Sequence, residues 1–155
     1  MATDVKDAIK TSLEQAKTFY LLDLEAIAEE KLGVSPGGVA RAPFDFTLEI
    51  ADVNRRFAAG MRDETLEKRS DEERASLIAG MTKASAKQMI EDSVGELIAA
   101  WMGLADDQIE KMIPAFGDER PAFAMASLAA THMMYHDGQL NYLQALNGDG
   151  AIHWM

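Results

Sequence analysis

The sequence predicts an all-α fold, a four-helix bundle with a short extra helix between its second and third long helices. Four long segments repeat apolar residues about every 3.6 positions, which is typical of amphipathic helices. No segment shows the alternation of apolar and polar residues that a half-buried strand requires. The chain has 155 residues, the size of one domain. We therefore expect residues 1–155 to form a single bundle, with a long crossover after the first helix.

Glycine and proline residues mark the predicted ends of the first two helices. The first is predicted over residues 3–31, and Gly33 ends it. Residues 34–43 contain a Ser-Pro-Gly-Gly stretch that interrupts helical structure, so we expect a loop there. The second helix is predicted over residues 45–61, with Asp45 as its N-cap.

Capping signals place the remaining helices. Ser70 and Glu73 fit a capping box, which predicts a short helix as far as Ala79. A third long helix is expected over residues 83–102. The fourth is expected over residues 121–146, because its first residue is a proline, which suits the first helical position.

Three shorter segments join or follow the predicted helices. Residues 106–110 are expected to add one helical turn, and residues 113–117 to form an extended linker. The tail, residues 151–155, is partly apolar, so we expect it to fold back onto the bundle.

The charge and the absence of cysteine exclude several classes of function. The net charge is -11, which repels both phosphate backbones and anionic lipid, so we expect no nucleic-acid and no membrane partner. With no cysteine, the chain has no disulfide, thiolate metal site or cysteine nucleophile of its own. The N-terminus lacks the pattern of a signal peptide, and no apolar run reaches the ~20 residues of a membrane span. The expected location is the cytoplasm.

Two histidines in the fourth predicted helix are the strongest candidates for a functional site. His132 and His136 are four residues apart, so they lie on the same face of that helix, and this face is apolar. An imidazole in such a position needs a partner. One interpretation is two core histidines that hydrogen-bond to neighbours such as Gln139, and the other is a pair of metal ligands.

The residues around this pair resemble the signature of the DinB-like (damage-inducible, YfiT-like) four-helix-bundle superfamily. The shared pattern is His132, His136, the Gly-Gln-Leu run at residues 138–140 and the Leu-Asn-Gly run at residues 146–148. The order and length of the predicted helices also match over nearly the whole chain. The resemblance implies a DinB/YfiT-like bundle, and members of this family often form homodimers.

The resemblance also implies a divalent metal, typically nickel or zinc, held by one side chain of the second helix and two of the fourth. The second-helix ligand is usually a histidine, and Glu49 stands at the matching position in this sequence. Two histidines and one carboxylate are an established ligand set for divalent ions. We therefore predict Glu49, His132 and His136 as the metal ligands, with a decayed metal site as the alternative.

Four other residues are weaker candidates. Asp52 is a weak candidate for a general base, and Arg56 is expected to pair with a nearby carboxylate, such as that of Glu49. Gly138 is expected to allow close helix packing, whereas Gln139 is expected to hydrogen-bond a ligand histidine or the backbone. His153, in the tail, is not expected to be a ligand.

These observations leave two hypotheses about function. By resemblance, the protein is a metal-dependent enzyme, a thiol S-transferase or isomerase that uses a low-molecular-weight thiol such as bacillithiol or mycothiol. The alternative is a non-catalytic homodimeric bundle with a degenerate metal site or a small bound ligand. The orientation of Glu49 discriminates between them, because an intact site needs its carboxylate beside both imidazoles.

Overall fold

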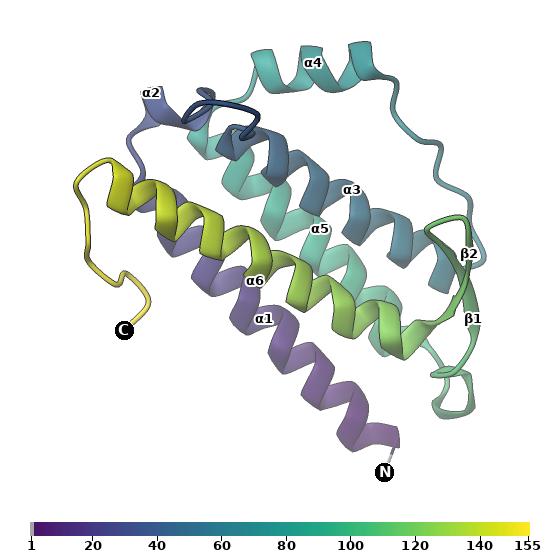
Figure 1. Ribbon diagram of the computed structural model, residues 1–155. Helices are drawn as coiled ribbons and strands as arrows, with labels where there is room; N and C mark the ends of the chain where they lie inside the picture. The colour runs from purple at the N-terminus through teal and green to yellow at the C-terminus, as the bar shows by residue number, and fades with distance from the viewer. Residues whose placement is uncertain (1) are drawn as a thin grey trace.

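The computed structural model describes residues 2–155 and consists mainly of one helical bundle (Figure 1). Its long helices are α1 (Ala2–Ala26), α3 (Pro43–Met61), α5 (Lys83–Gly103) and α6 (Ala122–Leu146). Its short elements are α2 (Glu29–Leu32), α4 (Asp71–Ala79), the 3-10 helix η1 (Asp106–Gln108) and the strands β1 (Met112–Ala115) and β2 (Asp118–Pro121). The predicted fold class is confirmed.

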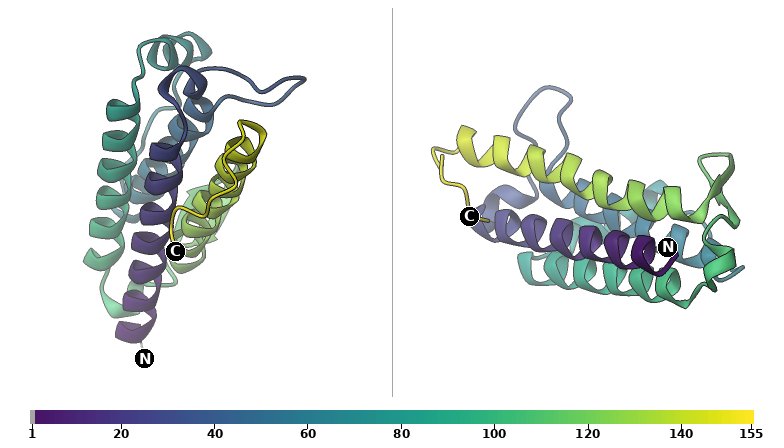
Figure 2. Two further views of the ribbon diagram at one scale, coloured as in Figure 1. Left: turned by 90° about the vertical axis from the view of Figure 1, so that its left-hand side faces the viewer. Right: turned by 90° about the horizontal axis from the view of Figure 1, so that it is seen from below.

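The long helices form two parallel pairs. α1 and α6 run in the same direction, since the C-terminal halves of both meet where the side chain of Gln144 binds Asp23. α3 and α5 run the other way, and the returning crossover, residues 62–82, carries α4 (Figures 1 and 2). The crossover that carries the chain back along the bundle therefore follows α3, whereas the sequence predicts the long crossover after the first helix. α3 packs more extensively against α5 than against α6.

Several helix ends differ from their predicted positions. The first helix stops at Ala26, where the amide of Gln144 donates a hydrogen bond to the Asp23 carbonyl of the last turn, and α2 follows as a separate turn. α3 begins at Pro43, whose fixed φ suits the first turn. Asp45 therefore lies inside the helix, and its carboxylate accepts a hydrogen bond from the Ala42 amide at 2.9 Å. The capping box of Ser70 and Glu73 is present as predicted.

The segment expected as an extended linker is the first strand of an antiparallel hairpin. β1 alternates in burial, with Ile113 and Ala115 inside, but all four of its residues are apolar or proline, so the sequence shows no alternation. Residues 116 and 117 make the turn with φ of 55° and 82°. The hairpin packs on α3 beside Gly60, where a Cβ atom would lie 3.2 Å from the Cβ of Ile113.

The core runs the length of the bundle, and its largest buried side chains include Tyr20, Phe57 and Trp101. The tail folds back as predicted, since the rings of Phe19 and Trp154 stack at 4.6 Å. Within residues 2–155, no helix has the length and the apolar character needed to cross a membrane.

Candidate metal centre

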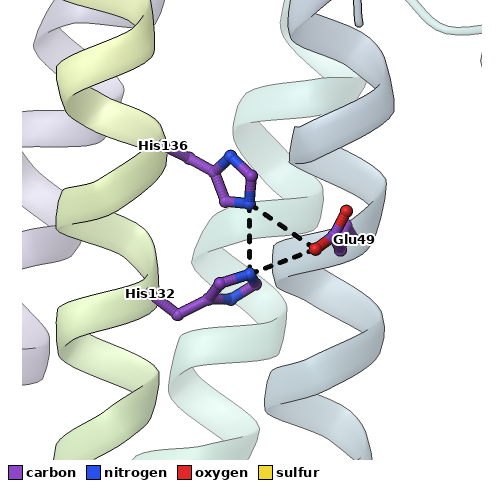
Figure 3. A group of neighbouring side chains, drawn as sticks. All are labelled: Glu49, His132 and His136. Atoms are coloured by element: carbon purple, nitrogen blue, oxygen red, sulfur yellow. Dashed lines mark hydrogen bonds and ion pairs between the residues drawn. The ribbon is translucent and has the colours of Figure 1, made fainter.

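The predicted ligand residues meet between α3 and α6. His132 and His136 project from one face of α6 toward Glu49 on the second turn of α3 (Figure 3). The Nε2 atoms of the two histidines lie 3.1 Å apart. Oε1 of Glu49 lies 3.3 Å from Nε2 of His132 and 3.7 Å from Nε2 of His136. The three side chains therefore present one nitrogen or oxygen atom each to a common point.

The spacing of these three atoms matches the size of a divalent metal ion. A triangle with edges of 3.1, 3.3 and 3.7 Å has a circumradius of about 2.0 Å, which equals the usual Zn–N and Zn–O bond lengths of about 2.0–2.2 Å. Neutral imidazole and carboxylate are also ligands that zinc and nickel accept. In geometry and in chemistry, the three residues therefore fit a single ion.

Gln139 orients the inner histidine. Its amide oxygen lies 2.6 Å from Nδ1 of His136, and the imidazole must donate this hydrogen bond because the oxygen can only accept. With its proton on Nδ1, a neutral His136 presents the lone pair of Nε2 to the centre, as a metal ligand must. Of the two contacts predicted for Gln139, with a histidine of the pair or with the backbone, the structure shows the one with the histidine.

Burial and aromatic packing fix the same ring. The side chain of His136 is only 1% exposed. Its ring stacks on Phe46 at 5.1 Å with an interplanar angle of 9°, and Tyr135 meets it edge-on at 5.0 Å. His132 is less enclosed, since its side chain is 19% exposed. The centre therefore has a rigid inner side and an outer side that solvent reaches.

Glu49 is held as a carboxylate. Hydrogen bonds with His132 and then His136 lower its pKa well below the ordinary value, against the effect of partial burial. Arg41, from the loop before α3, binds the other oxygen, Oε2, and lowers the pKa further. One oxygen of Glu49 thus faces the histidines while the other is neutralised, which keeps the residue in the charged form that a metal requires.

A pair of buried aspartates lies behind the centre, where α6 meets α1. Asp137 follows His136 in the chain and is 2% exposed, while Asp23 on α1 is fully buried. Asn141 and Gln144 donate hydrogen bonds to the carboxylate of Asp23 at 2.6 and 3.2 Å. Burial, together with the hydrogen bond and the charge of Asp23, raises the pKa of Asp137 to about 7. The pair therefore holds a proton near neutral pH and links the two parallel helices.

Asp52 and Arg56, two of the weaker candidates, lie outside the three-residue cluster. Both oxygens of Asp52 are occupied, by Arg69 at 3.0 Å and Arg74 at 2.9 Å, so this residue anchors the crossover and is not available as a base. Among residues 2–155, Arg56 makes no ion pair, so its predicted pairing is wrong. Glu49 binds Arg41 instead, and Asp52 binds Arg69 and Arg74.

The remaining candidates, His153 and Gly138, also lie outside the three-residue cluster. His153 bonds to Asp149 at 2.7 Å in the tail and takes no part in the cluster, as expected. Gly138 does not serve helix packing, because a Cβ atom built there would meet no atom within 4 Å. This prediction is wrong, since the α6 surface at Gly138 faces open space.

Arg41 and a neighbouring cavity could not be found from the sequence. A cavity of about 300 Å³ lies beside the histidines, between α3, α6 and the loop that carries Arg41. That loop projects from the bundle on the side of the C-terminal half of α6 (Figure 2). No sequence signal reports where such a loop returns to the bundle, so the ion pair of Arg41 with Glu49 could not be predicted.

No protein-family model and no curated protein sequence matches the chain. Solved structures do match. YfiT from Bacillus subtilis, described as a probable metal-dependent hydrolase with an unusual four-helix bundle topology, superposes with a TM-score of 0.74 at 16% identity, over 93% of this chain and 88% of that one. A DinB-like protein, YjoA, from Bacillus subtilis superposes with a TM-score of 0.69 at 16% identity, over 94% of both chains. The chain has the DinB-like fold.

A larger enzyme shares this fold. The mycothiol-dependent maleylpyruvate isomerase superposes with a TM-score of 0.70 at 17% identity, over 87% of this chain. The chain spans only 60% of the isomerase's length, so it matches one part of that protein. At these identities the comparisons establish the DinB-like fold, and the chemistry must be argued from the residues of the centre.

Proposed function

We propose that this DinB-like protein is an enzyme that depends on a divalent metal ion, zinc or nickel, held by Glu49, His132 and His136. The observation that carries the proposal is the convergence of two imidazole Nε2 atoms and one carboxylate oxygen at the spacing of a single ion. The description of YfiT as metal-dependent supports it.

Three protein ligands leave positions on the ion for a water molecule or a substrate. A divalent ion in such a site supplies Lewis acidity, which lowers the pKa of a water or thiol bound to it. The chain contains no cysteine, so a thiol nucleophile must come from a separate small molecule. We therefore propose a thiol S-transferase or isomerase that uses a low-molecular-weight thiol, and the mycothiol dependence of the isomerase with this fold supports the choice.

Neighbouring side chains hold the proposed ligand residues in place. Gln139 keeps the Nε2 lone pair of His136 directed at the centre, and Phe46 keeps its ring in place. Arg41 leaves Glu49 one oxygen for the ion and neutralises the other. The cavity offers space for a substrate beside Gln139 and Arg41, the residues that bind His136 and Glu49.

One observation favours a second candidate, a non-catalytic bundle. The central atoms of the cluster have partners without an ion, because one histidine can donate to the other at 3.1 Å and Arg41 neutralises Glu49; only Nδ1 of His132 is buried without a partner. In that case the three residues are a buried polar network, and the bundle binds a small ligand or serves a structural role.

Metal analysis separates the two candidates. Protein purified without an affinity tag is dialysed against zinc or nickel, and its metal content is measured for the wild type, Glu49→Ala and His136→Ala. His153→Ala is the matched control, since this histidine bonds to Asp149 outside the cluster. We expect about one ion per chain in the wild type and the control, and loss of the ion in both cluster variants. Wild-type protein that takes up no ion would favour the non-catalytic bundle.

Activity is then measured on the metal-loaded protein. Thiol consumption with bacillithiol, mycothiol or glutathione is followed in the presence of electrophiles such as monochlorobimane. Turnover that requires both the thiol and the ion, and that His136→Ala abolishes, supports the proposed S-transfer. Metal-loaded protein that turns over only an ester or amide, without any thiol, would instead indicate a hydrolase.

We also propose that the protein is a homodimer, as the family resemblance implies. Several large apolar side chains on α6 remain exposed, namely those of Phe123, Met134 and Leu146. Homodimer interfaces are enriched in such apolar surface. Light scattering during size-exclusion chromatography should give twice the 17.0 kDa mass of the chain, and a mass of one chain would contradict the proposal.

A further inference from the structure

The cavity beside the metal centre has a distinctive floor. Tyr135, Gly138 and Tyr142 are spaced by three and four residues, so they form one stripe along α6. The two tyrosines are seven residues apart, or about 10.5 Å along the helix at 1.5 Å per residue. They stand at the two ends of the stripe, and the bare backbone of Gly138 lies between them.

Gly138 has no explanation in the fold itself. A glycine inside a helix destabilises the helix relative to alanine. An added Cβ at Gly138 would meet no atom within 4 Å, so an alanine would fit the protein without any rearrangement. The position instead leaves the cavity floor free of a side chain, which matters only to something that lies in the cavity.

Three of the side chains that line the cavity are flat aromatic rings. Tyr135 and Tyr142 are 63% and 67% exposed, and Phe46 contributes a further ring from α3. Aromatic rings of this size gain from contact with the face or edge of another flat π-system. A cavity of about 300 Å³ lies at the lower end of the range for small-molecule sites, about 300–1,000 Å³. Its shape and lining therefore suit one small, flat group.

The charge of the lining selects an anion. Arg41 is the one charged residue among the cavity-lining residues in the described part of the chain. Its side chain is 45% exposed, and a guanidinium has five N–H donors, so donors remain beyond the contact with Glu49. A carboxylate matches the planar geometry of these donors.

We propose that this cavity binds a small carboxylate with a flat aromatic or conjugated body, which lies over Gly138 between Tyr135 and Tyr142 while its carboxylate contacts Arg41. The inference rests on the proposed function in one respect, because it makes this carboxylate the substrate class of the metal centre. Gly138 and Arg41 are then the residues that determine specificity, for the flat body and for the charge.

The contacts around the floor connect it directly to the centre. The Gln139 side chain lines the cavity, lies 3.5 Å from the hydroxyl of Tyr135, and also bonds to His136. Arg41 lines the cavity and binds Glu49. A carboxylate in the cavity thus lies next to two residues, Gln139 and Arg41, that each bind one of the proposed ligands.

Calorimetric titration of the zinc-loaded protein tests the inference with three probes. Benzoate is flat and anionic, cyclohexanecarboxylate is anionic but puckered, and benzamide is flat but neutral. We expect benzoate to bind about 3- to 10-fold more tightly than either of the other two. Equal affinity for benzoate and cyclohexanecarboxylate, or no binding of benzoate, would overturn the proposal.

Gly138→Ala tests the floor, and Gly95→Ala is its matched control. Gly95 also lies inside a long helix, α5, and an added Cβ there would meet no atom within 4 Å, but it does not line the cavity. Both changes should raise the melting temperature, because alanine is the better helix former. Only Gly138→Ala should weaken benzoate binding, by about 10-fold or more. Unchanged benzoate affinity in Gly138→Ala would refute the role of the floor.

The metal content of each sample separates this inference from the proposed function. Zinc-loaded protein that ignores benzoate would refute the carboxylate cavity and leave the metal centre intact. Protein that takes up no zinc but binds benzoate in a Gly138-dependent manner would refute the enzyme and leave the cavity in place.

Discussion

The buried pair of Asp137 and Asp23 predicts a stability that falls as pH rises toward neutrality. The pKa of Asp137 is raised from its ordinary value of 3.8 to about 7 by burial, followed by the hydrogen bond and charge of Asp23. Between these two values the folded protein holds a proton that the unfolded chain releases. The stabilisation is therefore fully present below pH 3.8 and is lost as pH rises through about 7.

The magnitude follows from the size of the pKa rise. At about 1.36 kcal/mol per pKa unit, a rise from 3.8 to about 7 corresponds to a ceiling of about 4 kcal/mol. We expect about half of this, about 2 kcal/mol, because Asp23 shares the proton and the pair can relax. Asp137→Asn mimics the protonated side chain at all pH values, since its amide can donate to Asp23 as the protonated carboxyl does.

The assay is urea unfolding between pH 4.5 and 8. EDTA is present to remove any contribution from a bound metal. The stability of Asp137→Asn relative to the wild type should increase steadily with pH over this range and level off above pH 7. Asp92→Asn, at an exposed position on α5, is the control and should show a constant difference. A constant difference in Asp137→Asn as well would refute the shared-proton interpretation of the buried pair.

Three further changes test the structure in different places. Gln139→Ala should weaken zinc binding by about 10- to 100-fold, measured by competition with a chelator, because the amide orients the inner ligand histidine; unchanged affinity would refute this orienting role. Thr47→Val should lower the free energy of unfolding by about 1–3 kcal/mol, because the Tyr20 hydroxyl is fully buried and bonds Thr47 at 2.7 Å; urea unfolding of Ser12→Ala, whose hydroxyl lies on the exposed surface of α1, should change little. Asp52→Ala should release α4, seen as faster amide hydrogen exchange in the crossover while exchange in α6 is unchanged, because Arg69 lies just before α4 and Arg74 lies within it; equal protection of α4 in the variant and the wild type would contradict the anchoring role of Asp52.

The fold was largely predictable because helical periodicity and caps are local. The capping box of Ser70 and Glu73 marks the start of α4. Its contacts join residues within four positions of each other, so the sequence alone reveals it. The hairpin was not predictable for the opposite reason. β1 is apolar on both faces, and its alternation appears only when Ile113 is seen to pack on α3 at Gly60.

In the candidate site, too, local features were predictable from the sequence and those that depend on tertiary packing were not. His132 and His136 were placed on one face by helical geometry alone, and the resemblance added Glu49. The structure brings the three together. Arg41 escaped prediction because it lies on a loop whose path back to Glu49 depends on tertiary packing. Gly138 was misassigned because a glycine in a helix signals close packing and open space equally well, and only the surroundings decide between them.

The central claim is that one ion sits among Glu49, His132 and His136, and anomalous diffraction tests it most directly. Crystals grown with zinc would be measured on both sides of the zinc absorption edge. We predict one anomalous peak at about 2.0–2.2 Å from Nε2 of both histidines and from Oε1 of Glu49. A peak elsewhere, or none at this position while the two histidines stay hydrogen-bonded to each other, would contradict the claim.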